Sequence, residues 1–213
     1  LQSQWADANI VQKEVFGGDC IRCPCFSCVE EDPVLESIET MIVTNLDATT
    51  KSQPGQPQYG KFAKFSFSKH SLVEGDDWDI AFRATTILVN GGFSGGEDEP
   101  NRSGIGAGYI QVGNYGSIKT VDESLFKQDS QTSKAIPTGS GNGWYNYNFQ
   151  SHIITPIAGR TLIFKTHNGR YAKVEIQSYY KDSPEIPNAS SSEAQYYTFT
   201  YTYQPNEGVL SFD

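Results

Sequence analysis

The last third of the chain contains two runs of alternating apolar and polar residues, RTLIFKT and RYAKVEIQSYY, separated by the sequence His-Asn-Gly at 167–169. In the second run Ala172, Val174 and Ile176 share one side. A period of two is typical of a half-buried strand. An Asn-Gly pair between two such runs predicts a β-hairpin with a type I′ turn, because that turn needs two residues at positive φ.

A third run, YYTFTYTY, places aromatic side chains on one face and threonines on the other. The aromatic face consists of Tyr197, Phe199, Tyr201 and Tyr203. Aromatic stripes of this kind are buried more often than they form ligand sites, since they carry the largest apolar surfaces. We therefore predict a β meander whose core is built on this stripe.

Earlier strands are predicted at three places. The run ETMIVTNLD at 39–47 is strand-like, and KFAKFSFS sets Ala63, Phe65 and Phe67 on one side. The run DWDIAFRATTILVN predicts one longer strand that stops at the glycine pair 91–92. Between the first two strands lies TTKSQPGQPQYG, which has no apolar face and is predicted to be a linker.

Between Phe93 and Gly143 the sequence is polar and rich in glycine, which predicts a long surface insert made of loops. Within it, Thr120 and Glu123 have the spacing of a capping box, which predicts a helix of one or two turns. The chain as a whole has 12 Tyr, 12 Phe and 20 Gly in 213 residues. This composition predicts an all-β protein without long helices.

The charge and the motifs exclude several classes of function. The net charge of −9 repels phosphate backbones, so nucleic acid is not an expected partner. No apolar run approaches the ~18 residues of a membrane helix, so no transmembrane segment is expected. The chain lacks the Gly-x-Ser-x-Gly, His-Glu-x-x-His and phosphate-loop motifs, and we predict that it is not an enzyme.

Two groups of carboxylates stand close together in the sequence. Asp76, Asp77 and Asp79 precede a predicted strand, and a second acidic group lies at 97–99. Both are predicted to be solvated turns, because a calcium site needs six or more oxygen ligands.

Three blocks carry a resemblance to a known family: DDWDIAFRATTILVNGGFSGG, the block that runs from GWYNYNFQSH to QSYYKD, and YYTFTYTYQP. In this order they resemble the HmuY family, the secreted or lipid-anchored haemophore-like proteins of Bacteroidota. The resemblance covers residues 39–205 and divides the chain into an N-terminal arm with cysteines (1–38) and an HmuY-like β domain (39–213). It implies two packed, mostly antiparallel sheets in a β-sandwich-like fold, an extracellular or cell-surface location, and haem as a ligand.

Haem iron needs axial ligands from His, Met, Cys or Tyr beside an apolar slot. In the family these ligands come from the insert and from the segment just after the Gly-Trp block. Here the insert contains no His, Met or Cys, and Phe149 occupies the matching position after Trp144, so the usual ligand pair is missing. The remaining candidate ligands are His152, His167, Tyr109 and Tyr115. The alternative is a structural role for each: packing for the tyrosines, an exposed turn or a strand edge for the histidines. No other metal site is predicted.

All four cysteines, Cys20, Cys23, Cys25 and Cys28, lie in the stretch CIRCPCFSC. The sequence FSCVEEDP resembles the first residues of related mature lipoproteins, but no apolar signal sequence precedes it, so lipid attachment is not expected. Zinc sites of four cysteines usually draw two pairs from separate segments, and a redox centre would need a helix start. An extracellular location favours disulfides, whose pairing the sequence leaves open.

The arm also contains ANIVQKEVF, which is long enough to add a strand to a sheet edge of another copy of the chain. The residues of this assembly strand are Asn9, Ile10, Val11, Val15 and Phe16. Two functions from different classes therefore stay open. One is a secreted, non-enzymatic HmuY-like protein that captures haem or a similar planar ligand. The other is a structural subunit of an extracellular filament or surface assembly, joined to its own copies through the arm.

Overall fold

The computed structural model describes residues 34–51 and 59–213. The four cysteines and the predicted assembly strand lie at positions 1–33, outside the described residues. In the two described ranges, no helix is long and apolar enough to cross a bilayer.

The elements in chain order are β1 (Glu39–Asp47), β2 (Ala63–Ser66), β3 (Ser71–Leu72), β4 (Ile80–Arg83), β5 (Thr86–Val89), β6 (Ala107–Val112), the 3-10 helices η1 (Tyr115–Ser117) and η2 (Glu123–Leu125), β7 (Tyr145–Asn148), β8 (Ile153–Pro156), β9 (Arg160–Lys165), β10 (Tyr171–Tyr180) and β11 (Ala194–Gln204).

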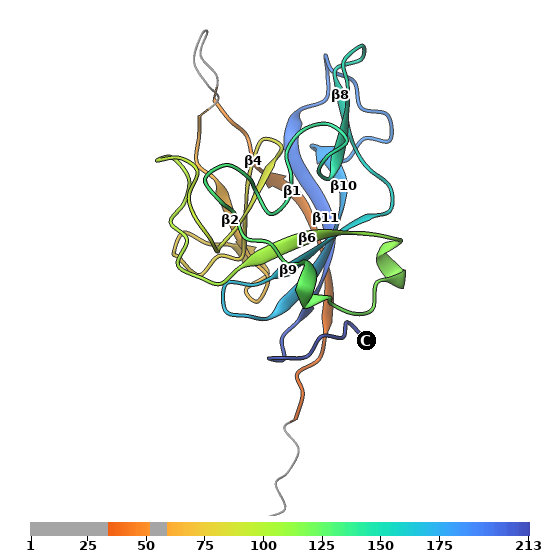
Figure 1. The fold of residues 1–213 in the computed structure, drawn as a ribbon. Helices are drawn as coiled ribbons and strands as arrows, with labels where there is room; N and C mark the ends of the chain where they lie inside the picture. The colour runs from red at the N-terminus through yellow and green to blue at the C-terminus, as the bar shows by residue number, and fades with distance from the viewer. Residues whose placement is uncertain (1–33, 52–58) are drawn as a thin grey trace, which may run out of the picture. The chain divides into compact units, whose positions relative to one another are not determined.

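In the part of the chain that the structure describes, these strands form two larger sheets and a separate hairpin (Figure 1). The five-stranded sheet has the order β1-β11-β10-β9-β6, the four-stranded sheet has the order β3-β2-β4-β5, and β7 pairs with β8. The strand pairs are antiparallel. The predicted all-β fold of two packed, mostly antiparallel sheets is confirmed, and the strand predicted at 39–47 is β1.

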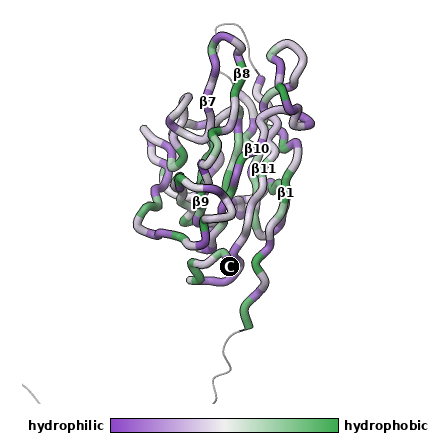
Figure 2. Tube along the Cα trace, turned by 90° about the vertical axis from the view of Figure 1, so that its right-hand side faces the viewer, coloured by the Kyte–Doolittle hydropathy of each residue, from purple (hydrophilic) through white to green (hydrophobic). Residues whose placement is uncertain are grey.

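The core lies between the two sheets and is built on the aromatic stripe of β11. Tyr197, Phe199 and Tyr201 are fully buried. From the opposite sheet, the ring centroid of Phe82 lies 4.7 Å from that of Tyr197, and that of Phe65 lies 5.6 Å from that of Phe199. Figure 2 shows hydrophobic stretches (green) along β1 and β8. The prediction that the stripe forms the core is confirmed.

The two ends of the sandwich carry different features. The backbone N–H of Glu36 donates to Asn206 Oδ1 over 2.8 Å, so the segment before β1 and the C-terminal segment share one end. The β7–β8 hairpin projects from the other end (Figures 1 and 2). At its base, the N–H of Ile154 donates to Tyr180 Oη over 2.9 Å. The tip of this hairpin therefore stands clear of the core.

The insert contributes a strand to the fold, which the sequence did not predict. Residues 107–112 form β6, which pairs with β9 at the edge of the five-stranded sheet. Gly108 in this strand lies against the ring of Phe164, and a Cβ at this position would be 3.1 Å from it. A glycine in a strand often marks such a close approach. Gly108 is needed in the strand because its missing Cβ lets the backbone pack against Phe164. The prediction of an insert made only of loops was therefore wrong.

Another part of the insert, around Ile118 and Val121, covers the outer face of the five-stranded sheet. A second buried cluster forms there, in which side chains of the insert and of the C-terminus pack on β9 and β10; its members are Tyr109, Ile118, Val121, Ile163, Tyr171 and Phe212. The predicted short helix in this region is the single 3-10 turn η2. Asp122 caps it by accepting a hydrogen bond from the N–H of Ser124 over 3.0 Å, in place of the predicted cap Thr120.

Two turns differ from the sequence predictions. In the β9–β10 turn Gly169 has a φ of 89°, but Asn168 is not at positive φ, and the N–H of Gly169 donates to the carbonyl of Thr166. This pattern is a type I turn followed by a left-handed glycine, in place of the predicted type I′ turn. The run predicted as one long strand is split into β4 and β5, which are joined by Ala84 (φ 46°) and Thr85.

A buried ion network holds the insert to the four-stranded sheet. Asp129 is buried, and its carboxylate accepts hydrogen bonds from the N–H of Val89 (3.1 Å), from the N–H of Ala135 (2.8 Å) and from Arg102 Nη2 (2.8 Å). The same Arg102 nitrogen lies 2.8 Å from Glu99 Oε2. The prediction that the acidic group at 97–99 is a solvated turn was therefore wrong for Glu99, whose side chain is only 9% exposed.

Replacing Arg102 by alanine should destabilise the protein strongly, because two buried carboxylates would lose their guanidinium partner. We expect a loss of about 3–5 kcal/mol in the free energy of unfolding, measured by urea denaturation. The control is Lys181→Ala, which breaks the exposed Lys181–Glu193 pair and should cost about 1 kcal/mol or less. Equal losses in the two variants would contradict the role given to the buried network.

Candidate functional site

The structure places the two predicted histidine ligands at opposite ends of the five-stranded sheet. His167 lies in the β9–β10 turn, next to Tyr171, whereas His152 lies in the β7–β8 hairpin, whose base contacts Tyr180. The ten residues of β10 separate the two positions, which is about 30 Å at the usual rise of a strand. His152 and His167 are therefore not part of one site.

The two predicted tyrosine ligands lie on the outer face of the same sheet. Tyr109 is buried, its ring packs edge to face on Phe126, and its hydroxyl accepts a hydrogen bond from the N–H of Asp122 over 3.0 Å. Burial raises the pKa of Tyr109. The hydroxyl of Tyr115 lies 2.6 Å from Thr202 Oγ1, and burial raises the pKa of Tyr115 to about 12. Both phenols are engaged in packing, away from either histidine.

His167, which is partly buried, is hydrogen-bonded to the buried Asp79 and so joins the two sheets. Its Nδ1 lies 2.7 Å from Asp79 Oδ1, and its backbone N–H donates to the same oxygen over 3.0 Å. The other oxygen of Asp79 accepts from the N–H of Phe67 over 2.7 Å. The prediction of a solvated turn was wrong for Asp79, which is buried because it satisfies these donors.

The β7–β8 hairpin carries an exposed phenol–imidazole pair. Tyr147 Oη lies 2.7 Å from His152 Nδ1, and both residues are exposed. The loop between them is shaped by Asn148, whose side-chain oxygen accepts from the N–H groups of Gln150 and Ser151. His152 has a φ of 57°, a left-handed conformation that is uncommon for residues other than glycine and often marks functional positions. At the tip, Phe149 is 74% exposed.

Tyr147 also lines a cleft beside the hairpin, which we call the tyrosine cleft. It has a volume of about 370 Å³ and is lined by Ala84, Thr85, Ser140, Tyr145, Tyr147, Ile154, Tyr179, Ala194 and Gln195. Tyr145 and Tyr147 are two residues apart on β7, so their rings share one face of the hairpin. Among the described residues, the hydroxyls of Tyr145 and Tyr179 have no hydrogen-bond partner. Burial raises the pKa of Tyr179.

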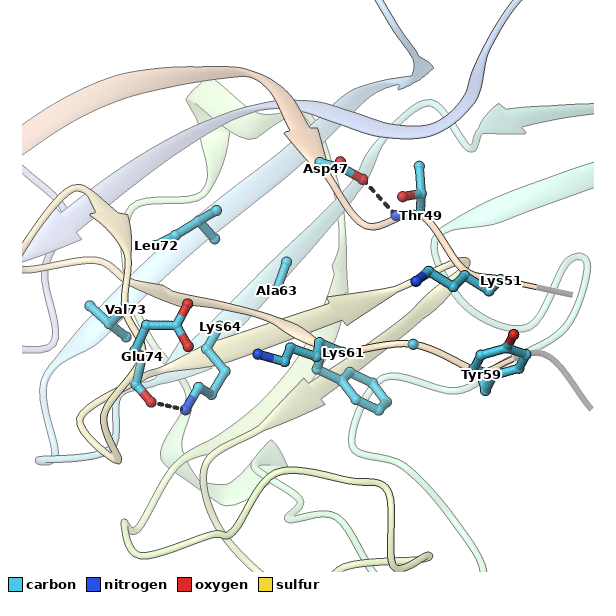
Figure 3. Close-up of a pocket in the computed structure, with 12 residues that line it drawn as sticks. Asp47, Thr49, Lys51, Tyr59, Lys61, Ala63, Lys64, Leu72, Val73 and Glu74 are labelled. Atoms are coloured by element: carbon cyan, nitrogen blue, oxygen red, sulfur yellow. Dashed lines mark hydrogen bonds between the residues drawn. The ribbon is translucent and has the colours of Figure 1, made fainter.

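A larger cleft, of about 510 Å³, lies where the end of β1 approaches β2 and β3 (Figure 3). Its walls include Ala63 and Leu72, and Figure 3 shows the amines of Lys51 and Lys61 extending into the space in front of them. Among the described residues that line it there is no histidine or methionine; its polar side chains are the amines of three lysines, the carboxylates of Asp47 and Glu74, and the hydroxyls of Thr49 and Tyr59. The same part of the chain holds no cluster of three or more His, Cys, Asp or Glu side chains that could bind a metal ion.

The sequence identified one member of the hairpin site and missed the others. His152 was a candidate ligand, but Tyr145, Tyr147 and Tyr179 were not. The sequence WYNYN could have identified two of them, because tyrosines at alternating positions must share a face of a strand. That this face borders a cleft depends on how the hairpin lies against Tyr179, which is far away in sequence.

Comparison with known proteins gives one family. The model of the HmuY protein family matches residues 58–201. Among solved structures, the chain is similar to an HmuY-like haem-binding protein from Bacteroides vulgatus ATCC 8482, with 15% identity and a TM-score of 0.46 over 79% of this chain and 93% of that one. A lipoprotein from Bacteroides fragilis NCTC 9343 gives 16% identity and a TM-score of 0.44 over 79% and 90%. The apo HmuY analogue of Tannerella forsythia gives 14% identity and 0.41 over 81% and 99%. No curated protein matches the chain.

The Asp79–His167 pair predicts how stability depends on pH. The hydrogen bond that the His167 ring donates to Asp79 raises the pKa of His167 in the folded protein. The pair therefore stabilises the fold fully below the unfolded pKa of about 6.5, and this contribution is lost as the pH rises through the folded pKa. We expect His167→Gln to lose more unfolding free energy at about pH 6 than at about pH 9, relative to the parent chain. Parallel pH profiles in urea denaturation would argue against the pair.

Proposed function

This chain belongs to the HmuY family, and we propose that it is a non-enzymatic binding protein at the cell surface or outside the cell that captures haem at the β7–β8 hairpin. The proposal rests on one observation: the hairpin presents the exposed Tyr147–His152 pair beside the tyrosine cleft. Imidazole and phenol groups are both known axial ligands of haem iron.

The surroundings of the three histidines favour His152 over the others as part of a haem site. Both ring nitrogens of His70 are engaged, Nδ1 with Tyr201 Oη at 2.6 Å and Nε2 with Glu39 at 2.9 Å. His167 is held by Asp79 between the sheets. His152 has one ring nitrogen bound to Tyr147, and it is an exposed residue on a projecting hairpin. A hydrogen bond to one ring nitrogen orients an imidazole, as in many metal sites.

The tyrosine cleft suits one edge of a planar ligand. Its volume of about 370 Å³ is near the lower end of the range of about 300–1,000 Å³ for small-molecule sites. Three aromatic rings on its walls offer flat apolar surface, and two free hydroxyls can donate to polar groups of the ligand. A relative with a solved structure is described as a haem-binding protein, which agrees with this choice of ligand.

Titration with hemin tests the proposal. The parent chain should give a Soret band that is shifted from that of free hemin and saturates at an equimolar ratio. His152→Asn should weaken binding about 10- to 100-fold, because the pair would be broken. Asparagine is chosen since it tolerates the left-handed backbone at this position.

The matched control is His70→Gln, which removes a histidine from the other tyrosine–histidine pair of the described chain. This control should bind hemin as the parent chain does. A flat titration of the parent chain at micromolar hemin would contradict haem capture.

A further inference from the structure

We propose, on the basis of the proposed function, that Tyr147 is the residue whose oxygen binds the ferric iron, and that His152 is a positioning residue that accepts the phenol proton. The geometry that carries this inference is the hydrogen bond of 2.7 Å between Tyr147 Oη and His152 Nδ1 on an exposed hairpin. A phenol is a weak ligand until it loses its proton, and this tyrosine has a base in contact with its hydroxyl.

The lining of the tyrosine cleft distinguishes the two residues. Tyr147 lines the cleft together with Tyr145 and Tyr179, whereas His152 is not among the residues that line it. A planar ligand lodged in the cleft would therefore contact Tyr147, and His152 would act on it through Tyr147. His152 contacts that hydroxyl from the hairpin loop, with its Nδ1 already committed to Tyr147.

The proton that Tyr147 would lose on binding iron can be taken up by His152. Haem, when bound, would supply the ferric iron, and Tyr147 Oη would hold it. Tyr147 would give its hydroxyl proton to Nδ1 of His152, which already lies 2.7 Å from that oxygen. The protonated ring would then donate a hydrogen bond to the phenolate oxygen and stabilise its negative charge. The iron stays ferric throughout, so no oxidant or reductant is needed.

The chain holds a second pair of the same kind, which shows why exposure matters. His70 Nδ1 lies 2.6 Å from Tyr201 Oη, a distance similar to that in the hairpin pair. Tyr201 is fully buried, and its ring packs between those of Phe65 and Phe67. No ligand can approach this phenol, so the second pair has a structural role. The hairpin pair has the same chemistry at an accessible position.

The neighbouring phenols fit the polar edge of haem. The hydroxyls of Tyr145 and Tyr179 have no hydrogen-bond partner among the described residues, and neither oxygen is closed off from solvent, although both side chains are largely buried. Each hydroxyl can therefore donate to an acceptor that enters the cleft. The two carboxylates of haem are acceptors of this kind, and they can approach along the cleft that Tyr147 borders.

Ligation by a phenolate also predicts a preference for the oxidation state of the iron. An anionic oxygen is a hard ligand that suits ferric iron better than ferrous iron, whereas imidazole binds both. The complex should therefore weaken when the iron is reduced. A histidine ligand would leave the affinity for ferrous haem much less changed.

The experiment compares Tyr147→Phe with His152→Asn in the full chain, using hemin as the probe. Tyr147 is 41% exposed, and within residues 34–51 and 59–213 its hydroxyl forms a hydrogen bond only with His152, so Tyr147→Phe should fold normally. We expect this variant to lose the tyrosinate vibrations seen by resonance Raman spectroscopy in the parent complex, together with at least about tenfold in affinity. His152→Asn should keep these vibrations at saturating hemin while its affinity falls. The controls are Tyr115→Phe and His70→Gln, which should keep both.

The outcomes separate this inference from the proposed function. A parent chain that binds hemin without tyrosinate vibrations, and equally well after Tyr147→Phe, would leave haem capture intact and overturn the role of Tyr147. Loss of all binding in His152→Asn, with Tyr147→Phe unaffected, would make the histidine the ligand and would also overturn it. A parent chain that does not bind hemin would overturn both the function and the inference. Ring-deuterated tyrosine provides a check on the unaltered chain, since it should shift the same vibrations.

Discussion

The burial of the aromatic stripe of β11 is the interaction on which the rest of the structure depends. β11 is paired on both sides, with β1 and β10, so its register fixes the centre of the five-stranded sheet. Phe65 and Phe82 of the opposite sheet pack on the stripe and set how the two layers face each other. Large rings packed edge to face leave few alternative arrangements, because a shift by one residue would bring threonines into the core.

Because the core lies between the two sheets, the two ends of the sandwich can have different roles. At the end that carries the β9–β10 turn, Asp79 and His167 tie the sheets together. At the other end, the base of the β7–β8 hairpin contributes Tyr145 to the core and donates a hydrogen bond to Tyr180. The exposed side chains nearer its tip are available for a ligand, and the left-handed backbone of His152 lies there. The Tyr147–His152 pair is thus outside the core, whereas Tyr145 and Tyr179 belong both to the core and to the tyrosine cleft.

Membership of the HmuY family sets the expectation of haem, and the residues proposed to bind it in this chain differ from those that the family resemblance implies. The insert that supplies ligands in family haemophores carries no His, Met or Cys here, and it is used instead to cover the outer face of the five-stranded sheet. Phe149 occupies the matching position on the hairpin, where it is exposed. The phenol–imidazole pair on the same hairpin is the proposed substitute, which places the ligand a few residues from the position that resembles the family site.

The sequence by itself determined the all-β class, the strand at 39–47 and the buried face of β11, because alternation and aromatic content report burial along one strand. Only the tertiary structure decided which distant residues meet. Gly108 belongs to a strand because Phe164 lies against it, and Asp79 is buried because three donors from two segments converge on it. Tyr147 borders a cleft because Tyr179 closes the other side. Local patterns carry no information on such contacts, since these depend on how separate strands pack against each other.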